Sequence, residues 1–110
     1  MTSSLLPNYL LSNRKRLALS QDDVAFLLGT QSGAKVSRHE RFDREPSLKT
    51  ALAYEAIYQR SASELFSGLY QEVEQEVVAR AKTLAAKTVK STPQTTKRNE
   101  ALVALARHAI

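Results

Sequence analysis

A short polar segment, AKVSRHE at residues 34–40, carries two cationic side chains three residues apart, Lys35 and Arg38. In a helix, this spacing places both side chains on one face. The guanidinium of Arg38 presents two parallel N–H donors that match the O6 and N7 acceptors of guanine in the DNA major groove. A contact of Arg38 with a backbone phosphate is the alternative. The two cations therefore give the expected helix a basic face that suits a polyanionic partner.

Residues suited to catalysis or metal binding are scarce. The two histidines, His39 and His108, are far apart in the chain, and there is no cysteine. The three glycines, Gly29, Gly33 and Gly68, do not form a phosphate-binding loop. Because catalytic and metal sites need clustered acids, nucleophiles or ligands, the sequence predicts neither an enzyme nor a protein with a metal or cofactor. We expect His39 to be packed or partly exposed.

The composition is that of a small folded protein with an excess of positive charge. Of the 110 residues, 43% are hydrophobic, and 16 Lys and Arg against 11 Asp and Glu give a net charge of +5. This excess favours a polyanionic partner. No segment approaches the roughly 20 apolar residues of a membrane span, and the opening residues, MTSSLLPNYLLSN, lack the basic start of a signal peptide. We therefore expect a cytoplasmic protein without membrane association.

Apolar residues recur at intervals of three and four along the chain and do not alternate, which predicts an all-α protein. The first helix is expected to begin near Pro7, because a first turn tolerates the missing N–H of proline. Ser20 is the expected N-cap of a second helix, since Asp23 stands at the capping-box position. Gly29 is expected to end this helix, because glycine readily adopts the left-handed conformation at a helix C-terminus.

Three further helices complete the N-terminal part. Ser32 is the expected cap of a short third helix at about residues 33–40, and Ser47 is the expected cap of the fourth. A break at residues 59–61 leads to a fifth helix that ends near residues 66–68. The side chains expected to face inward from the fourth helix are Leu48, Ala51, Leu52, Ala56 and Tyr58.

The character of the sequence changes after Gly68. Residues 70–90 contain no Gly or Pro, and glutamates lie near their start while lysines lie near their end, as the helix dipole favours. A linker, STPQTT, and a short last helix at residues 97–109 are expected to follow. The side chains that align at helical spacing within 70–90 are Tyr70, Val73, Val77, Ala81, Leu84 and Thr88.

Three motifs occur in order, LSQDDVAFLLG at residues 19–29, VSRHE at 36–40 and PSLKTALAYEAIYQRSASELF at 46–66. Together they resemble the helix-turn-helix domain of the Cro/C1-type, or Xre, family of transcriptional regulators. The resemblance covers about residues 6–69 and implies a five-helix, lambda-repressor-like DNA-binding domain, with residues 70–110 as a C-terminal extension of one or two helices. It is carried by Leu19, Ser20, Gln21, Ala25, Gly29, Ser37, Arg38, Glu40, Pro46, Ser47, Leu48, Leu65 and Phe66.

The resemblance implies roles for individual side chains. Gln21 matches a glutamine that binds a DNA phosphate, with an ordinary polar residue of a first turn as the alternative. Arg41, Arg44 and Lys49 flank the third helix and are implied to contact phosphates, with a solvated charged face as the alternative. The residues implied to line the groove from the third helix and the turn before it are Gln31, Ser32, Ala34, Lys35, Ser37 and Arg38.

The resemblance also implies a structural ion pair between Arg14 and Glu40, which would hold the first helix against the third. The sequence departs from the family pattern in the turn after Gly29, which is one residue longer than usual. Phe42 stands where glycine is frequent, and Phe26 where a polar residue is usual. We therefore expect a bulged turn and an altered loop path.

The function implied by the resemblance is that of a sequence-specific, repressor-like regulator that binds double-stranded DNA as a homodimer. Residues 70–110 are the candidate dimerisation element. The alternative is an antitoxin-like or other protein-interaction module, in which these C-terminal helices bind a partner protein. Folding of residues 70–110 only on a partner would favour that alternative.

Overall fold

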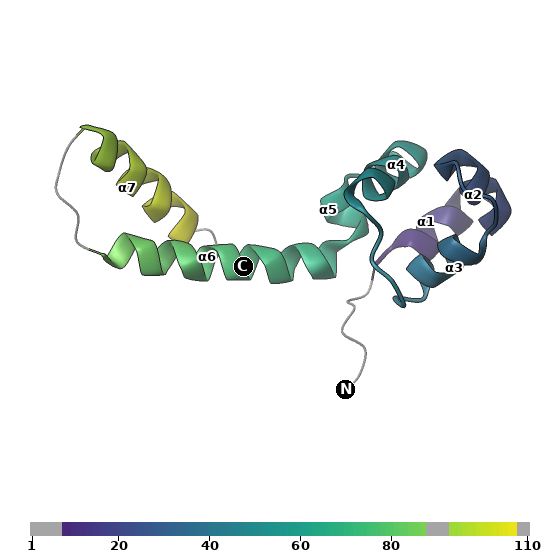
Figure 1. The fold of residues 1–110 in the computed structure, drawn as a ribbon, viewed down its shortest axis with the longest axis horizontal. Coiled ribbons are helices and arrows are strands. Elements are labelled where there is room, and N and C mark those ends of the chain that lie inside the picture. Colours follow the sequence, from purple (N-terminus) through teal and green to yellow (C-terminus); the bar gives the residue numbers. More distant parts are fainter. Residues whose placement is uncertain (1–7, 88–92, 108–110) are drawn as a thin grey trace. The chain divides into compact units, whose positions relative to one another are not determined.

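The computed structural model describes residues 8–87 and 93–107, and within these ranges every element of secondary structure is a helix (Figure 1). This finding confirms the all-α prediction. By its contacts the chain divides into two compact units, Met1–Tyr70 and Gln71–Ile110. The helices are α1 (Leu10–Arg16), α2 (Gln21–Leu28), α3 (Ala34–Glu40), α4 (Leu48–Tyr58), α5 (Ala62–Leu65), α6 (Ser67–Ala86) and α7 (Pro93–Ala106).

The first unit is built around one hydrophobic core to which each of its five short helices contributes. Tyr54 and Tyr58, one turn apart on α4, stack with their ring centroids 5.9 Å apart, and Phe66 meets the edge of Tyr54 at 6.3 Å. Aromatic pairs of this kind supply much of the apolar area of a small core. The buried side chains of the core are Leu10, Val24, Ala25, Val36, Tyr54, Tyr58 and Leu65.

The expected helix caps are present at α2 and α4. The Ser20 hydroxyl accepts from the Asp23 N–H at 2.9 Å, and the Asp23 carboxylate accepts from the Ser20 N–H at 2.9 Å. Gly29 ends α2 in the left-handed conformation, with φ +83°. The Ser47 hydroxyl accepts from the N–H of Thr50 at 3.2 Å. These bonds satisfy amides that a helix leaves unpaired at its ends.

Two predicted helix starts are wrong. Helix α1 begins at Leu10 rather than near Pro7, which lies outside the described residues. The chain before α1 is engaged elsewhere, because the N–H of Tyr9 donates to the Leu65 carbonyl at 2.8 Å. Gly33, not Ser32, is the N-cap residue of α3, and no side chain caps this helix. The Ser32 hydroxyl lies 3.4 Å from the Ala34 N–H, which is a long and weak contact.

The predicted inward face of α4 is also wrong in part. Leu48 is 76% exposed and Leu52 is 53% exposed, and Ala56 is exposed as well. Tyr58 is fully buried as predicted, and the face that enters the core also includes Tyr54, which is fully buried but was not predicted. Helix α4 carries more apolar side chains than one face accommodates, and the two aromatic rings bury the larger area.

The second unit contains most of α6 and all of α7. The segment STPQTT was expected to be a linker, but Pro93–Thr96 form the first turn of α7, where proline at the first position favours helix formation. Residues 91 and 92 lie outside the described part of the chain, as do residues 88–90 at the expected end of the preceding helix. Helix α7 buries none of its side chains, and α6 buries Val78 and Ala81. Within the described ranges, no helix combines the length and apolar character needed to cross a membrane.

Candidate nucleic-acid interface

The connection between α2 and α3 depends on a glycine at the start of α3. The N–H of Gly33 donates to the Asp22 carboxylate at 3.1 Å. A Cβ atom at Gly33 would lie 2.9 Å from Asp22 Oδ1, 3.0 Å from Gln21 Cβ and 3.2 Å from the Gln21 carbonyl carbon. A side chain at position 33 would therefore crowd the place where the N-terminal ends of α2 and α3 meet, and glycine avoids this crowding.

A hydrogen-bonded ion pair fixes the other end of α3. Arg14 Nε donates to Glu40 Oε2 at 2.6 Å and its Nη2 donates to Oε1 at 3.1 Å, so the ion pair predicted from the sequence is present. Arg14 Nη1 also donates to the Leu19 carbonyl at 3.0 Å. The hydrogen bond to Glu40 raises the pKa of Arg14 above its ordinary value. Helix α3 is thus tied to α1 through a charged, largely buried contact.

Helix α3 presents two distinct faces. Val36, His39 and Glu40 are buried, and their spacing of three and four residues defines the inner face. Lys35 and Arg38 are exposed on the outer side, and the described residues form no ion pair with either of them. The outer face is therefore positively charged and open to solvent.

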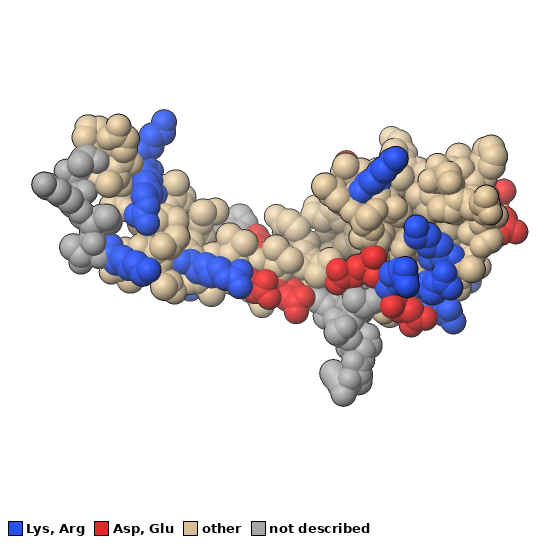
Figure 2. Space-filling view, viewed as in Figure 1, with Lys and Arg blue, Asp and Glu red and all other residues tan. Residues whose placement is uncertain are grey.

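The other predicted contact residues surround this face. Gln31 and Ser32 are exposed in the turn, Ala34 is exposed at the start of α3, and Ser37 is half-buried. Beyond the helix, Arg44 is exposed. Lys and Arg side chains gather over α3 and the loop that follows it, with acidic side chains at their edge (Figure 2). The structure thus brings most of the predicted contact residues to one surface.

Two of the predicted phosphate-binding residues have partners within the protein. Arg41 lies 3.5 Å from the Asp43 carboxylate, and both side chains are more than half exposed. The Gln21 amide donates to Glu40 Oε1 at 3.1 Å. Because a carboxylate only accepts, this contact orients the NH₂ group of Gln21 toward Glu40 and leaves one of its two hydrogens for another acceptor.

Carboxylates occupy the N-terminal end of α2. The Asp22 carboxylate accepts from the N–H of Gly33, and the Asp23 carboxylate accepts from the backbone N–H of its cap, Ser20. The hydrogen bond from the Ser20 backbone lowers the pKa of Asp23, so that this side chain is ionised at neutral pH. These charges suit the helix dipole and also repel an approaching anion. Contact with a phosphate at this end must therefore come from the amide of Gln21 rather than from the helix terminus.

His39 lies directly behind the basic face and is fully buried. Its Nδ1 forms a hydrogen bond of 2.8 Å with the Tyr54 hydroxyl, and no hydrogen-bond partner among the described residues reaches its Nε2. Burial lowers the pKa of His39, and the positive charges of Lys35, Arg44 and Arg38 lower it further. The ring is therefore neutral at pH 7. Its position three residues after Val36 is the sequence signal that places it on the inner face.

The remaining departures from the family pattern have visible structural counterparts. Phe42 adopts a left-handed conformation with φ +66°, which is the conformation for which glycine is best suited. Phe26 projects from α2 and is 83% exposed. The turn between α2 and α3 spans residues 29–33, consistent with the extra residue.

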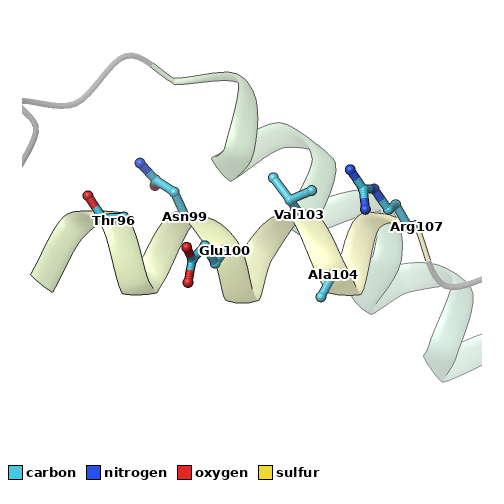
Figure 3. A pocket seen from close by; sticks show the side chains of 6 residues that line it. All are labelled: Thr96, Asn99, Glu100, Val103, Ala104 and Arg107. Carbon is cyan, nitrogen blue, oxygen red and sulfur yellow. The ribbon is translucent and has the colours of Figure 1, made fainter. Parts of the chain in front are cut away.

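No cluster of metal-binding side chains is found in the described ranges. No three side chains among their histidines, aspartates and glutamates lie close enough together to hold a metal ion. A surface hollow along α7 is lined by residues of this helix and by Arg107, which directly follows it (Figure 3). The residues that line it are Thr96, Asn99, Glu100, Val103, Ala104 and Arg107.

Comparison with known proteins adds no relative: no family model, no curated protein and no solved structure matches the chain.

Proposed function

We propose that the first unit binds double-stranded DNA with α3 in the major groove, and that the protein is a sequence-specific, repressor-like transcriptional regulator. The observation that carries this proposal is the charge distribution on α3. Its single carboxylate, Glu40, is buried against Arg14, whereas Lys35 and Arg38 are exposed on the opposite side. A polyanion approaching the outer face of α3 therefore meets cations of this helix and none of its carboxylates.

The dimensions and chemistry of α3 suit direct base readout. The major groove, about 12 Å wide, admits an α-helix. Arg38 supplies the paired donors that guanine accepts, and Lys35, one turn away, supplies a second cation. Ala34 offers a methyl group for contact with thymine, while Gln31 and Ser32 in the turn present amide and hydroxyl groups.

Phosphate contacts would hold this helix in register. Arg44 and Lys49 are exposed and have no ion-pair partner among the described residues, so both are ready for phosphates. Arg41 must exchange Asp43 for a phosphate, at low cost because an exposed ion pair contributes little. The hydrogen bond to Glu40 orients the side-chain amide of Gln21. We propose that the second amide hydrogen donates to a phosphate at the start of α2.

We infer a dimer from the length of α3, the helix proposed to enter the groove. It has seven residues and can contact only a few base pairs. Two copies on a two-fold symmetric operator would double the site, and occupancy of a promoter by such a dimer would exclude polymerase.

An antitoxin-like or other protein-interaction function is the second candidate. It is favoured by α7, because this helix fully buries no side chain and leaves the apolar Val103 and Leu105 38% and 45% exposed. A short helix that fully buries no side chain gains little stability from packing and is marginal alone. Hydrogen exchange of the isolated chain tests this candidate, since rapid exchange across residues 93–106 is expected if α7 folds only on a partner protein.

Selection of bound duplexes from random DNA at two salt concentrations tests the main proposal. We expect an enriched two-fold symmetric motif and a steep loss of affinity with salt. Arg38→Ala should weaken specific binding by about 10- to 100-fold and weaken non-specific binding less, because a bidentate base contact contributes about 1–3 kcal/mol.

Arg107→Ala is the matched control, because it removes the same charge from an exposed position in the second unit. Its binding should remain close to that of the unmodified protein. The absence of an enriched motif, or equal losses for Arg38→Ala and Arg107→Ala, would contradict the proposal.

A further inference from the structure

Helix α6 carries an apolar stripe that the described residues leave exposed. Tyr70, Val73, Val77 and Leu84 recur along the helix and remain 39–50% exposed. Of the two side chains that α6 buries, Ala81 lies at one edge of the stripe, four residues after Val77, and Val78 lies further around the helix. The exposed part of the stripe therefore runs along a helix of 20 residues, beside a face that is already buried.

The charges of α6 are separated along its length. Residues 67–76 contain three glutamates and no cation, whereas residues 77–87 contain one arginine, two lysines and no carboxylate. Acidic side chains lie at the beginning of α6 and basic ones toward its end (Figure 2). On one flank of the stripe, Glu76 and Arg80 lie 4.0 Å apart within the helix, and both remain more than half exposed.

We propose that a second copy of this chain docks on the stripe in the antiparallel orientation, with a two-fold axis close to Val77. Tyr70 precedes Val77 by seven residues and Leu84 follows it by seven, so the axis places each opposite the other in the partner copy. Val77 then packs near the axis against its own counterpart. Four exposed apolar side chains on each copy become covered.

Charge complementarity decides the orientation. A parallel pair places the acidic halves side by side and the basic halves side by side, which is unfavourable. An antiparallel pair places each acidic half along a basic half. Glu76 lies one residue before Val77, and Arg80 lies three residues after it. In the antiparallel pair, Glu76 of one copy and Arg80 of the other therefore lie at nearly the same height along the helices, because a helix rises only about 1.5 Å per residue.

This pairing does not depend on DNA binding, although it would supply the second copy that a two-fold operator needs. The stripe is small compared with a standard interface of about 1,600 Å². We therefore expect a reversible dimer with a dissociation constant on the order of 10 μM.

The orientation is tested by distance measurements between spin labels on the full chain. The protein has no cysteine of its own, so each introduced thiol is unique. Ala79→Cys and Ala86→Cys place labels on exposed positions of α6, two and nine residues from the axis, opposite the stripe. Antiparallel pairing predicts that the two Ala86 labels lie about 10 Å further apart than the two Ala79 labels. Equal distances would indicate a parallel pair and overturn the proposal.

Sedimentation equilibrium of the full chain without DNA tests the surface itself. The mass should rise with concentration toward twice 12.2 kDa, and Val77→Glu should abolish this rise while circular dichroism shows an unchanged helix content. Val103→Glu, at an exposed apolar position on α7, is the control and should still dimerise. Glu76→Lys should weaken the dimer at least several-fold, and Glu76→Lys with Arg80→Glu should restore it. A single-chain mass at about 100 μM, ten times the expected dissociation constant, would overturn the proposal whether or not DNA is bound.

Discussion

Arg14 in α1 and Glu40 at the end of α3 form a two-point ion pair that links the first helix to the helix that we propose for DNA. The two donor–acceptor distances are 2.6 and 3.1 Å. Only 14% of the Arg14 side chain and 3% of the Glu40 side chain are exposed. Water therefore has little access to either side chain and cannot easily replace its partner. Paired, charge-assisted hydrogen bonds of this kind are strong and directional.

Loss of either partner should destabilise the first unit. Arg14→Ala leaves the Glu40 carboxylate buried without its counter-charge, and we expect the free energy of unfolding to fall by about 3 kcal/mol. Urea unfolding followed by circular dichroism measures this change. Arg41→Ala is the matched control, because it breaks the exposed pair with Asp43 and should cost less than about 1 kcal/mol. Similar losses for the two variants would refute the structural role of Arg14.

Gly33→Ala should destabilise the junction of α2 and α3. The added Cβ would lie 2.9 Å from Asp22 Oδ1 and 3.0 Å from Gln21 Cβ, and the nearby backbone of Gln21 cannot move without shifting α2. We expect a loss of about 1–3 kcal/mol in urea unfolding. Gly29→Ala is the control: its Cβ would meet no atom within 4 Å, so only the cost of a left-handed alanine, about 1–2 kcal/mol, is expected. A smaller loss for Gly33→Ala than for Gly29→Ala would show that the close approach is not restrictive.

Stability of the first unit should fall in mild acid because of His39. Its folded-state pKa is lowered by burial and by three neighbouring cations. Above about pH 6.5 the ring is neutral in both states. As the pH falls through that value, the unfolded chain binds a proton that the folded chain resists, so the free energy of unfolding decreases.

Urea unfolding at about pH 7.5 and about pH 5.5 measures this dependence on pH. His39→Gln, which removes the titrating ring, should reduce the loss in acid even if it lowers stability at both pH values. His108→Gln replaces the other histidine and should retain the dependence. An unchanged pH dependence in His39→Gln would rule out His39 as its source.

Ala18→Gly should increase stability. Ala18 is exposed and has φ +59°, a conformation that costs a residue with a Cβ about 1–2 kcal/mol. Part of the gain is offset because glycine gives the unfolded chain more freedom, so we expect a net increase of about 0.5–1 kcal/mol. Ala56→Gly, at an exposed position inside α4, should instead lower stability by a similar amount. Thermal unfolding of both variants in parallel distinguishes the two effects.

Local sequence signals predicted several parts of the fold correctly. The caps of α2 and α4 depend on side chains within three residues of the amides that they bind, and Gly29 ends α2 through its own backbone freedom. These features need no tertiary information. The start of α1 was misplaced because a long-range bond, from Tyr9 to Leu65, determines where the chain enters that helix.

The sequence by itself determined the helical class, the caps of α2 and α4 and the collection of cations at residues 35–44, since each follows from spacing along the chain. Only the tertiary structure decided which apolar side chains enter the core. It buried Tyr54 and Tyr58 and left Leu48 and Leu52 exposed, because one helix face had to pack against the other helices of the unit. It also buried His39 behind the basic face and left little room for a side chain at position 33. Both features depend on segments distant in sequence that pack within van der Waals contact.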